Sequence, residues 1–132
     1  MELKEIYINN NYGKFCLANV IPELKSRISN ELSNYGQPIM LSFTLFGSYC
    51  RNEQTDESDI DLCLIYNHKN ISELNINLIV DKIADDFLDK YGTIFNILCF
   101  PDTYYEKNKN TSRLFKDIER EGIACWMNLK LI

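Results

Sequence analysis

Four residues near the middle of the chain have the types and spacing that nucleotide chemistry requires. Gly47 and Ser48 are adjacent, and ten residues separate them from the pair Asp59 and Asp61. A glycine lets the backbone approach a phosphate closely, and the serine adds a hydroxyl and an amide donor. Two carboxylates one residue apart are suitable ligands for a divalent cation such as Mg²⁺. The pattern predicts a site for a nucleoside triphosphate and a metal.

Two predicted strands position these residues. The apolar run over residues 40–46 leads directly into Gly47, and a second run over residues 59–66 begins with the two acids. Residues two apart on a strand point to the same face, so Asp59 and Asp61 project together, with their Cα atoms about 6.6 Å apart. The alternating residues of this strand are apolar and can pack in a core, which would hold the carboxylates rigidly.

A further charged group follows the Gly-Ser pair. Arg51 lies three residues past Ser48, and we expect its guanidinium to bind the same phosphates. Each motif alone has a simpler interpretation, because a Gly-Ser dipeptide is most often a plain turn and an Asp-x-Asp pair is most often a solvated strand end. Since both motifs occur in this order between two predicted strands, we favour a binding site.

The remaining elements follow from hydrophobic periodicity and turn residues. We expect a hairpin within residues 5–17, helices over residues 22–35 and 72–90, a strand over residues 94–100, a helix beginning at Thr111 or Ser112 and ending near Gly122, and a last strand over residues 123–131. This order predicts an α/β (α+β) fold with a mixed β-sheet and helices mainly on one face.

Composition limits the classes of function. A chain of 132 residues is long enough for one domain, and its net charge of −5 disfavours a protein that grips long nucleic acid. The five cysteines include no CxxC pair, which indicates free thiols in a reducing compartment. No apolar run reaches 18 residues and the N-terminus lacks a secretory pattern, so we expect a cytoplasmic protein. The single histidine, His68, lies in a predicted turn and is expected to be a surface residue.

The central motif resembles the signature of the minimal nucleotidyltransferases of the DNA polymerase β superfamily, which include MNT antitoxins. The segments that carry the resemblance are residues 45–51, residues 58–62 and residues 114–123. The similarity extends over about residues 21–127. We therefore expect a single nucleotidyltransferase-like domain over residues 1–132, in which residues 1–20 form an N-terminal extension.

The resemblance implies a nucleotidyltransferase fold and transfer of a nucleoside monophosphate, in particular AMP from ATP, to a hydroxyl group. Gly47 and Ser48 would bind the triphosphate, and Asp59 and Asp61 would be the catalytic acids that hold two Mg²⁺ ions. Many small members are antitoxins beside HEPN-domain toxins, which they can adenylylate. The resemblance therefore also implies a protein partner, with a HEPN-domain protein as the candidate.

The sequence departs from the family at one important position. Members usually place a third carboxylate on the next core strand, and counting back from Pro101 puts Asn96 there. An asparagine can ligate a metal through its carbonyl oxygen, but it carries no charge and cannot accept the proton of an attacking hydroxyl. A general base contributes typically about 10²–10⁴-fold to a rate.

Two functions therefore stay open from the sequence. The first is an enzyme that transfers a nucleotide to a protein. The second is a catalytically degenerate nucleotidyltransferase domain that neutralises a HEPN partner by binding alone. A nucleic-acid polymerase is disfavoured by the acidic charge and the absence of further domains.

Overall fold

The computed structural model describes residues 2–36 and 39–127 and is built around a four-stranded mixed sheet. The strand order is β5-β4-β3-β6. Strands β4 and β5 are parallel, and β3 pairs antiparallel with both β4 and β6. The strands are β3 (Met40–Phe46), β4 (Ile60–Tyr66), β5 (Phe95–Pro101) and β6 (Ile123–Met127).

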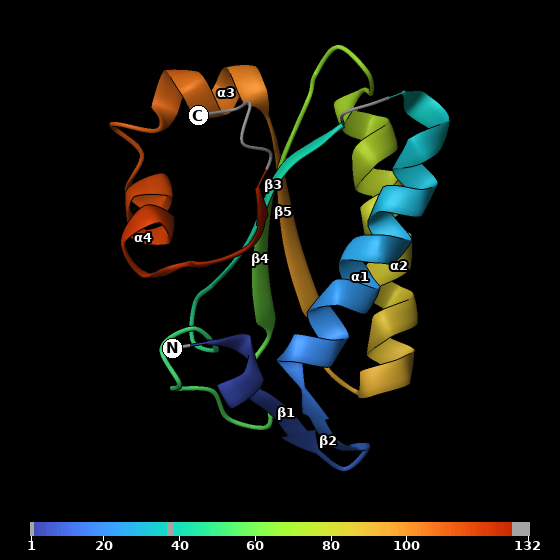
Figure 1. Ribbon diagram of the computed structural model, residues 1–132, viewed down its shortest axis with the longest axis vertical. Coiled ribbons are helices and arrows are strands. Elements are labelled where there is room, and N and C mark those ends of the chain that lie inside the picture. The colour runs from blue at the N-terminus through green and yellow to red at the C-terminus, as the bar shows by residue number, and fades with distance from the viewer. Residues whose placement is uncertain (1, 37–38, 128–132) are drawn as a thin grey trace.

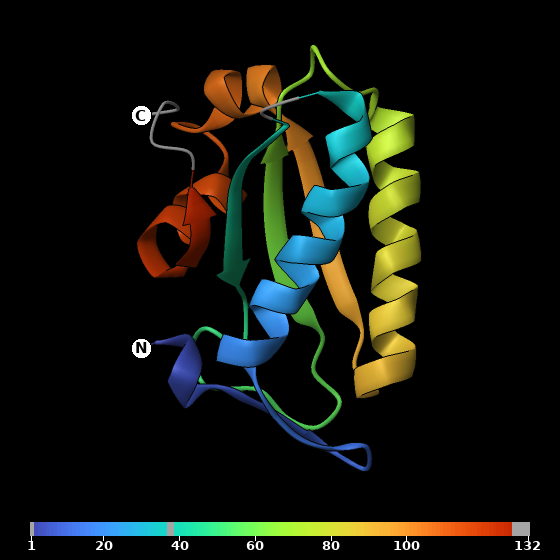
Figure 2. The same cartoon turned by 45° about the vertical axis from the view of Figure 1, so that its right-hand side comes forward.

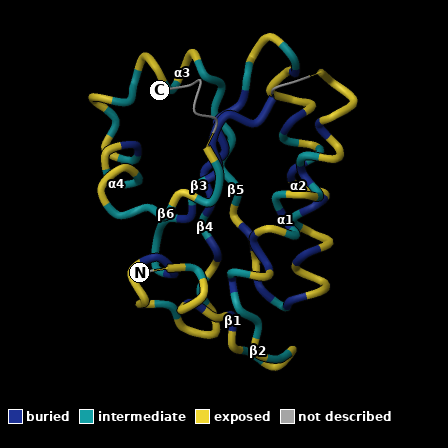
Figure 3. Tube along the Cα trace, in the orientation of Figure 1, coloured by how far each residue is buried: buried dark blue, intermediate teal, exposed yellow. Residues whose placement is uncertain are grey.

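Two long helices cover one face of this sheet, namely α1 (Leu17–Leu32) and α2 (Glu73–Tyr91) (Figure 1). Their buried residues recur at helical spacing and pack against the sheet, as the periodicity predicted. The Ser72 hydroxyl caps α2 by accepting a hydrogen bond from the Asn75 amide at 3.1 Å. Gly92 ends the helix in the left-handed conformation, with φ +69°. Figure 3 shows that burial is concentrated in the sheet and in the helix faces turned toward it.

Two short helices lie on the opposite side of the sheet (Figure 2). They are α3 (Asp102–Asn108) and α4 (Arg113–Glu121), and α4 is capped by the Ser112 hydroxyl. Phe115 of α4 forms a second, smaller core with residues of β3 and β4. The sequence predicted helices mainly on one face, and the two long helices confirm this, while α3 and α4 cover part of the other face.

The sequence did not predict α3, and it placed the start of α1 too late. Helix α3 has only seven residues, and aromatic contacts hold it. The Tyr104 ring stacks 5.5 Å from Phe100 of β5, and Tyr104 and Tyr105 pack against Phe115 of α4. Helix α1 begins at Leu17, so Pro22 lies inside it rather than in its first turn. Burial of the apolar residues that precede the proline offsets the backbone hydrogen bond that the proline cannot make. The last strand was predicted to reach residue 131, and its residues beyond 127 lie outside the described chain.

An N-terminal hairpin, predicted within residues 5–17, consists of β1 (Tyr7–Asn10) and β2 (Gly13–Cys16) and follows the 3₁₀ turn η1 (Leu3–Glu5). A second 3₁₀ turn, η2 (Ser33–Tyr35), ends the α1 segment. The Asn10 amide donates hydrogen bonds to the Tyr91 carbonyl at 2.9 Å and to the Thr93 hydroxyl at 3.1 Å. These bonds fix the hairpin to the end of α2. The hairpin therefore lies at the end of the sheet where β4 and β5 begin (Figure 2).

The single histidine lies at the surface, as the sequence predicted, and the cysteines range from buried to partly exposed. All five cysteines are free, and burial raises the pKa of the Cys63 thiol to about 12. His68 is exposed in its turn, with Nδ1 2.7 Å from a carboxylate oxygen of Asp102. Within residues 2–36 and 39–127, none of the helices combines the length and apolar character needed to span a bilayer.

Candidate nucleotide-binding site

Gly47 follows the last residue of β3 and packs directly against Asp61 of β4. Its φ is +79°, a conformation that side chains rarely adopt. A Cβ atom at this position would overlap Oδ2 of Asp61 and lie 3.2 Å from its Cγ. The glycine is therefore required both by the turn and by the close approach of the carboxylate.

A tight turn follows Gly47. The amides of Cys50 and Arg51 donate to the carbonyls of Gly47 and Ser48, each at 3.2 Å, and the Cys50 thiol donates to the Gly47 carbonyl at 3.0 Å. The first amides of such a helical turn have no carbonyl partner within it. The Ser48 and Tyr49 amides are therefore suitable donors for a phosphate.

Strand pairing brings the predicted acids and Asn96 to one place. Asp61 pairs in register with Phe46, the residue before Gly47, on one side and with Asn96 of β5 on the other. The Asn96 amide donates a hydrogen bond to Oδ1 of Asp61 at 3.1 Å. Asn96 thus occupies the strand position beside Asp61 at which we expected a third carboxylate.

The two acids differ in environment. Asp59 is exposed just before β4, whereas Asp61 is half-buried within it. Burial raises the pKa of Asp61, and the charge of Asp59 adds to this rise, while the Asn96 hydrogen bond and the Arg51 charge oppose it. A second negative charge beside a half-buried carboxylate is unfavourable without a cation.

These residues fit a magnesium ion only in part. Asp59 and Asp61 would supply two oxygen ligands, and Mg²⁺ usually completes its shell with water and substrate phosphates. Within the described ranges, no group of three or more acids, cysteines or histidines is arranged to hold a metal. The donor set is sufficient for one ion, and a second ion would have to rely on the neutral carbonyl oxygen of Asn96. A bound Mg²⁺ would offset phosphate charge here.

Arg51 pairs with two carboxylates in the structure. Its guanidinium lies 3.0 Å from Glu53 and 3.1 Å from Glu121, the last residue of α4. The predicted phosphate contact of Arg51 therefore requires an exchange of partner. Glu121 was not identified from the sequence, because it is far from the motif along the chain and no spacing rule connects the two.

Tyr49 is a second residue that the sequence analysis missed. Only 2% of its surface is exposed. Burial raises the pKa of its hydroxyl, the Thr93 side chain opposes this rise, and the charge of Asp59 adds to it. The Tyr49 hydroxyl is therefore close enough to the acids to feel the charge of Asp59. Its position directly after Ser48 was the only available signal.

Gly47→Ala should damage this site specifically. A residue with a side chain at positive φ costs about 1–3 kcal/mol, and the added methyl group would displace the Asp61 carboxylate. We expect a lower melting temperature in thermal unfolding and loss of MgATP binding in calorimetry. Gly36→Ala is the matched control, because Gly36 also has a positive φ, of +103°, but among the described residues its added Cβ would meet the side chain of Asn70 instead of a site carboxylate. The control should lose stability and keep its nucleotide affinity, and equal losses of affinity in both variants would contradict the assignment.

A glycine turn at the end of one strand, beside acids at the start of the next, in a mixed sheet covered by two long helices, defines a nucleotidyltransferase fold. A family model described as polymerase beta, nucleotidyltransferase, matches residues 26–122, which is most of the chain. The protein therefore belongs to this family, as its motif predicted.

Individual relatives agree with this assignment. A Methanocaldococcus jannaschii protein assigned as a protein adenylyltransferase is 30% identical over 78 residues, which cover 59% of this chain and 70% of that protein. A crystal structure of a mutant of the toxin-antitoxin MntA-HpeT has a TM-score of 0.53 at 16% identity, covering 85% of this chain and 74% of that one. A second mutant of the same pair gives 0.50 at 16% identity, with 86% and 74% covered. At this identity, the structural likeness establishes the fold.

Proposed function

We propose that the protein transfers AMP from ATP to a hydroxyl group of a protein partner, with Mg²⁺ bound by Asp59 and Asp61. The observation that carries this proposal is the contact of Gly47 with the Asp61 carboxylate. It joins the Gly47–Ser48 turn, which we call the phosphate turn, and the predicted metal ligands in one site, inside the range that matches the family model. The roles of Gly47, Ser48, Arg51, Asp59 and Asp61 are parts of this proposal.

The reaction would be an in-line displacement at the α-phosphorus of ATP. The acceptor oxygen forms a bond to this phosphorus, the bond to the bridging oxygen of pyrophosphate breaks, and pyrophosphate leaves. The Ser48 and Tyr49 amides would hold the phosphates, and Asp59 and Asp61 would hold the cation. Because Asn96 cannot accept a proton, the proton of the acceptor hydroxyl would pass to water.

Two comparisons support the choice of a protein acceptor. The relative from Methanocaldococcus jannaschii is assigned as a protein adenylyltransferase. The MntA-HpeT structures belong to a toxin-antitoxin pair, so a protein with this fold is known beside a toxin. We propose the antitoxin role for this chain as well, with a HEPN-domain toxin as the partner and ATP as the donor.

The presence of Asn96 favours one alternative function, in which the protein neutralises a partner by binding and transfers no nucleotide. The strand position beside Asp61 has an amide that donates a hydrogen bond where a carboxylate was expected. This replacement removes one ligand charge and one proton acceptor. A protein with this change can still bind a nucleotide and neutralise a toxin by contact alone, without transfer.

Transfer and simple binding can be separated with ATP labelled at different phosphates. The purified protein is incubated with MgCl₂ and a candidate HEPN-domain partner protein, using ATP labelled at the α- or the γ-phosphate. AMP transfer predicts covalent label on the partner from α-labelled ATP and none from γ-labelled ATP. A stable complex without label would support the binding alternative. Neither label nor complex would reject both functions with this partner.

A further inference from the structure

Strand β5 forms one edge of the sheet, beside β4 and next to α2 (Figure 2). The strands β4 and β5 are parallel, and the Ile60 amide donates to the Ile94 carbonyl at 2.9 Å. In such a ladder, alternate residues of β5 turn both backbone groups toward β4, and the residues between them turn theirs outward. The amides and carbonyls of Phe95, Ile97 and Cys99 therefore point away from β4, and no described residue pairs with them.

This edge lacks the features that usually protect an edge strand, which are charges, a proline, a bulge or a covering segment. Residues 93–100 include no charged side chain, and the only proline, Pro101, is the last residue of the strand. The register with β4 is continuous over all seven residues. In contrast, β6 at the other edge has five described residues, and its register with β3 shifts between Phe43 and Thr44. Of the two edges, β5 is therefore the better suited to pair with another strand.

The exposure of β5 agrees with an open edge. In β4 every residue except Asp61 is buried, whereas in β5 only Phe95 is buried. The apolar residues 97–100 stay partly exposed, and Ile94, directly before the strand, is 52% exposed. A strand added beside β5 would bury part of this apolar surface in addition to pairing the backbone groups.

Helix α2 gives this edge an acidic border. Burial raises the pKa of the Cys99 thiol to about 12, and the charges of Cys63 and Asp81 add to this rise, so Asp81 lies close to Cys99. Asp81 is exposed, and no described cation forms an ion pair with it. Leu88 lies two turns further along the same side of α2, nearer the start of β5, and is 38% exposed. A basic residue in an added strand would suit the position beside Cys99.

The position beside Asn96 belongs to the candidate nucleotide-binding site. Asn96 shares a sheet face with Asp61, and a residue paired beside Asn96 in an added strand would point to the same face. Neighbouring strands are about 4.8 Å apart, which places the Cα atom of this residue about 10 Å from that of Asp61. A nucleotide phosphate bound at Asp61 would occupy the space between them. An added strand would therefore present one side chain to the reacting phosphate.

We propose that β5 binds an extended segment of the acceptor protein as a fifth strand, with the acceptor hydroxyl beside Asn96 and a basic residue beside Asp81. This inference rests on the proposed function and specifies how its protein substrate is recognised. Because Asn96 and Cys99 are three positions apart, the hydroxyl residue and the basic residue are also three positions apart in the segment, on opposite faces. Hydrogen bonds to the backbone of Ile97 and Cys99 supply affinity, and these two side chains supply specificity.

A second copy of this chain fits the edge less well. Antiparallel pairing of two β5 strands would bring two α2 helices side by side, each with the exposed acids Asp81 and Asp85. Each copy also carries a net charge of −5. Like charges brought together across an interface oppose association. The acidic border therefore favours a basic segment of another protein.

The test uses the fluorescein-labelled peptide Gly-Val-Lys-Val-Val-Ser-Val-Gly, which has the proposed spacing. Its binding to the whole protein is measured by fluorescence anisotropy at low ionic strength. Ile97→Pro removes an outward amide but keeps the ladder with β4, and it should weaken binding at least about fivefold. Ile97→Val is the matched control, since it keeps this amide and should bind like the wild type. Both variants should keep the MgATP affinity of the wild type.

A charge exchange tests the acidic border without altering the strand. Asp81→Lys should weaken binding of this peptide about threefold and should tighten binding of the same peptide with glutamate in place of lysine by a similar factor. Asp81 is exposed, so this variant should fold like the wild type.

Amide hydrogen exchange gives a readout that needs no substitution. The Ile97 and Cys99 amides should exchange rapidly in the free protein and should be slowed at least about tenfold by saturating peptide. The Leu98 amide points toward β4 and should be protected in both states. With α-labelled ATP and Mg²⁺, the peptide should become labelled, and a peptide with alanine in place of serine should not.

Several results would overturn the inference, and they can be told apart from failure of the proposed function. No saturable binding of the peptide by the wild type, or equal affinities in the wild type, Ile97→Pro and Asp81→Lys, would reject the edge as the binding surface. A wild-type dimer in sedimentation that Ile97→Pro dissociates would assign the edge to a second copy instead. Peptide bound at β5 without transfer of label would keep the strand-binding edge and reject transfer to this acceptor. Label transferred equally by the wild type and both variants would keep the proposed function and reject the inference. Circular dichroism of each variant checks that it is folded.

Discussion

Asn96→Asp should raise the rate of AMP transfer by about 10²–10⁴-fold, the typical contribution of a general base. The new carboxylate would stand in register with Asp61, where the Asn96 amide now lies 3.1 Å from Oδ1. It would add a charged metal ligand and a group that can accept the proton of the acceptor hydroxyl. The measurement is the initial rate of label transfer from α-labelled ATP to the partner at saturating Mg²⁺.

The same variant has a second signature that does not depend on activity. Without metal, two carboxylates at this distance repel each other, so the melting temperature should fall below that of the wild type. Added Mg²⁺ should then raise the melting temperature more than it does in the wild type. Asn96→Ala is the control, since it removes the hydrogen bond without adding charge and should give neither effect. If Asn96→Asp transfers AMP no faster than the wild type, the missing carboxylate does not limit catalysis.

Asp59→Ala should abolish magnesium-dependent nucleotide binding, with a loss in affinity of at least about 100-fold. Removing even a residue that only supports a metal ligand commonly costs 10–100-fold, and Asp59 is one of only two carboxylates in the site. Because its side chain is exposed and precedes β4, the substitution should leave the melting temperature nearly unchanged. Calorimetric titration of MgATP checks the first expectation and thermal unfolding checks the second.

Glu57→Ala is the control for the loss of charge. Glu57 is an exposed acid two residues before Asp59 in the same loop, and nothing assigns it to the site. Its removal changes the net charge by the same amount and should leave MgATP affinity within about twofold of the wild type. Unaltered MgATP binding by Asp59→Ala would reject the metal assignment.

The parts of the fold that were predictable are those determined by local patterns. Strand β3 was predicted with its observed bounds because an uninterrupted apolar run meets a glycine, and α2 because a serine cap and a C-terminal glycine enclose one periodic face. Helix α3 depends instead on packing of Tyr104 and Tyr105 against Phe115. These contacts join segments whose proximity only the complete fold establishes.

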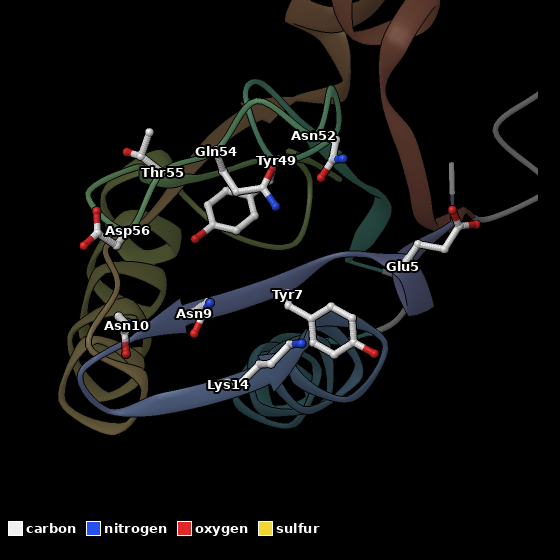
Figure 4. Close-up of a pocket in the computed structure, with 10 residues that line it drawn as sticks. All are labelled: Glu5, Tyr7, Asn9, Asn10, Lys14, Tyr49, Asn52, Gln54, Thr55 and Asp56. Carbon is white, nitrogen blue, oxygen red and sulfur yellow. The ribbon is translucent and has the colours of Figure 1, made fainter.

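The candidate site likewise has parts that local sequence patterns predict and parts that depend on the complete fold. The acids and the Gly-Ser turn were recognisable from their spacing, and the place of Asn96 followed from counting along a predicted strand. The pairing of Arg51 with Glu121 was not predictable, since it depends on where α4 ends relative to the turn. A cavity between the N-terminal hairpin and the loop over residues 49–56 was not predictable either, because it exists only where these two segments meet (Figure 4).

Glu121 competes with a bound phosphate for the guanidinium of Arg51. Both side chains are partly exposed, and pairs of this kind contribute only about 0–1 kcal/mol. A triphosphate can therefore displace Glu121 from the guanidinium at little cost. The released carboxylate belongs to the last residue of α4, which packs on the sheet face opposite the two long helices. Binding of a nucleotide at the phosphate turn would in this way leave an unpaired carboxylate at the end of α4, on the sheet face opposite α1 and α2.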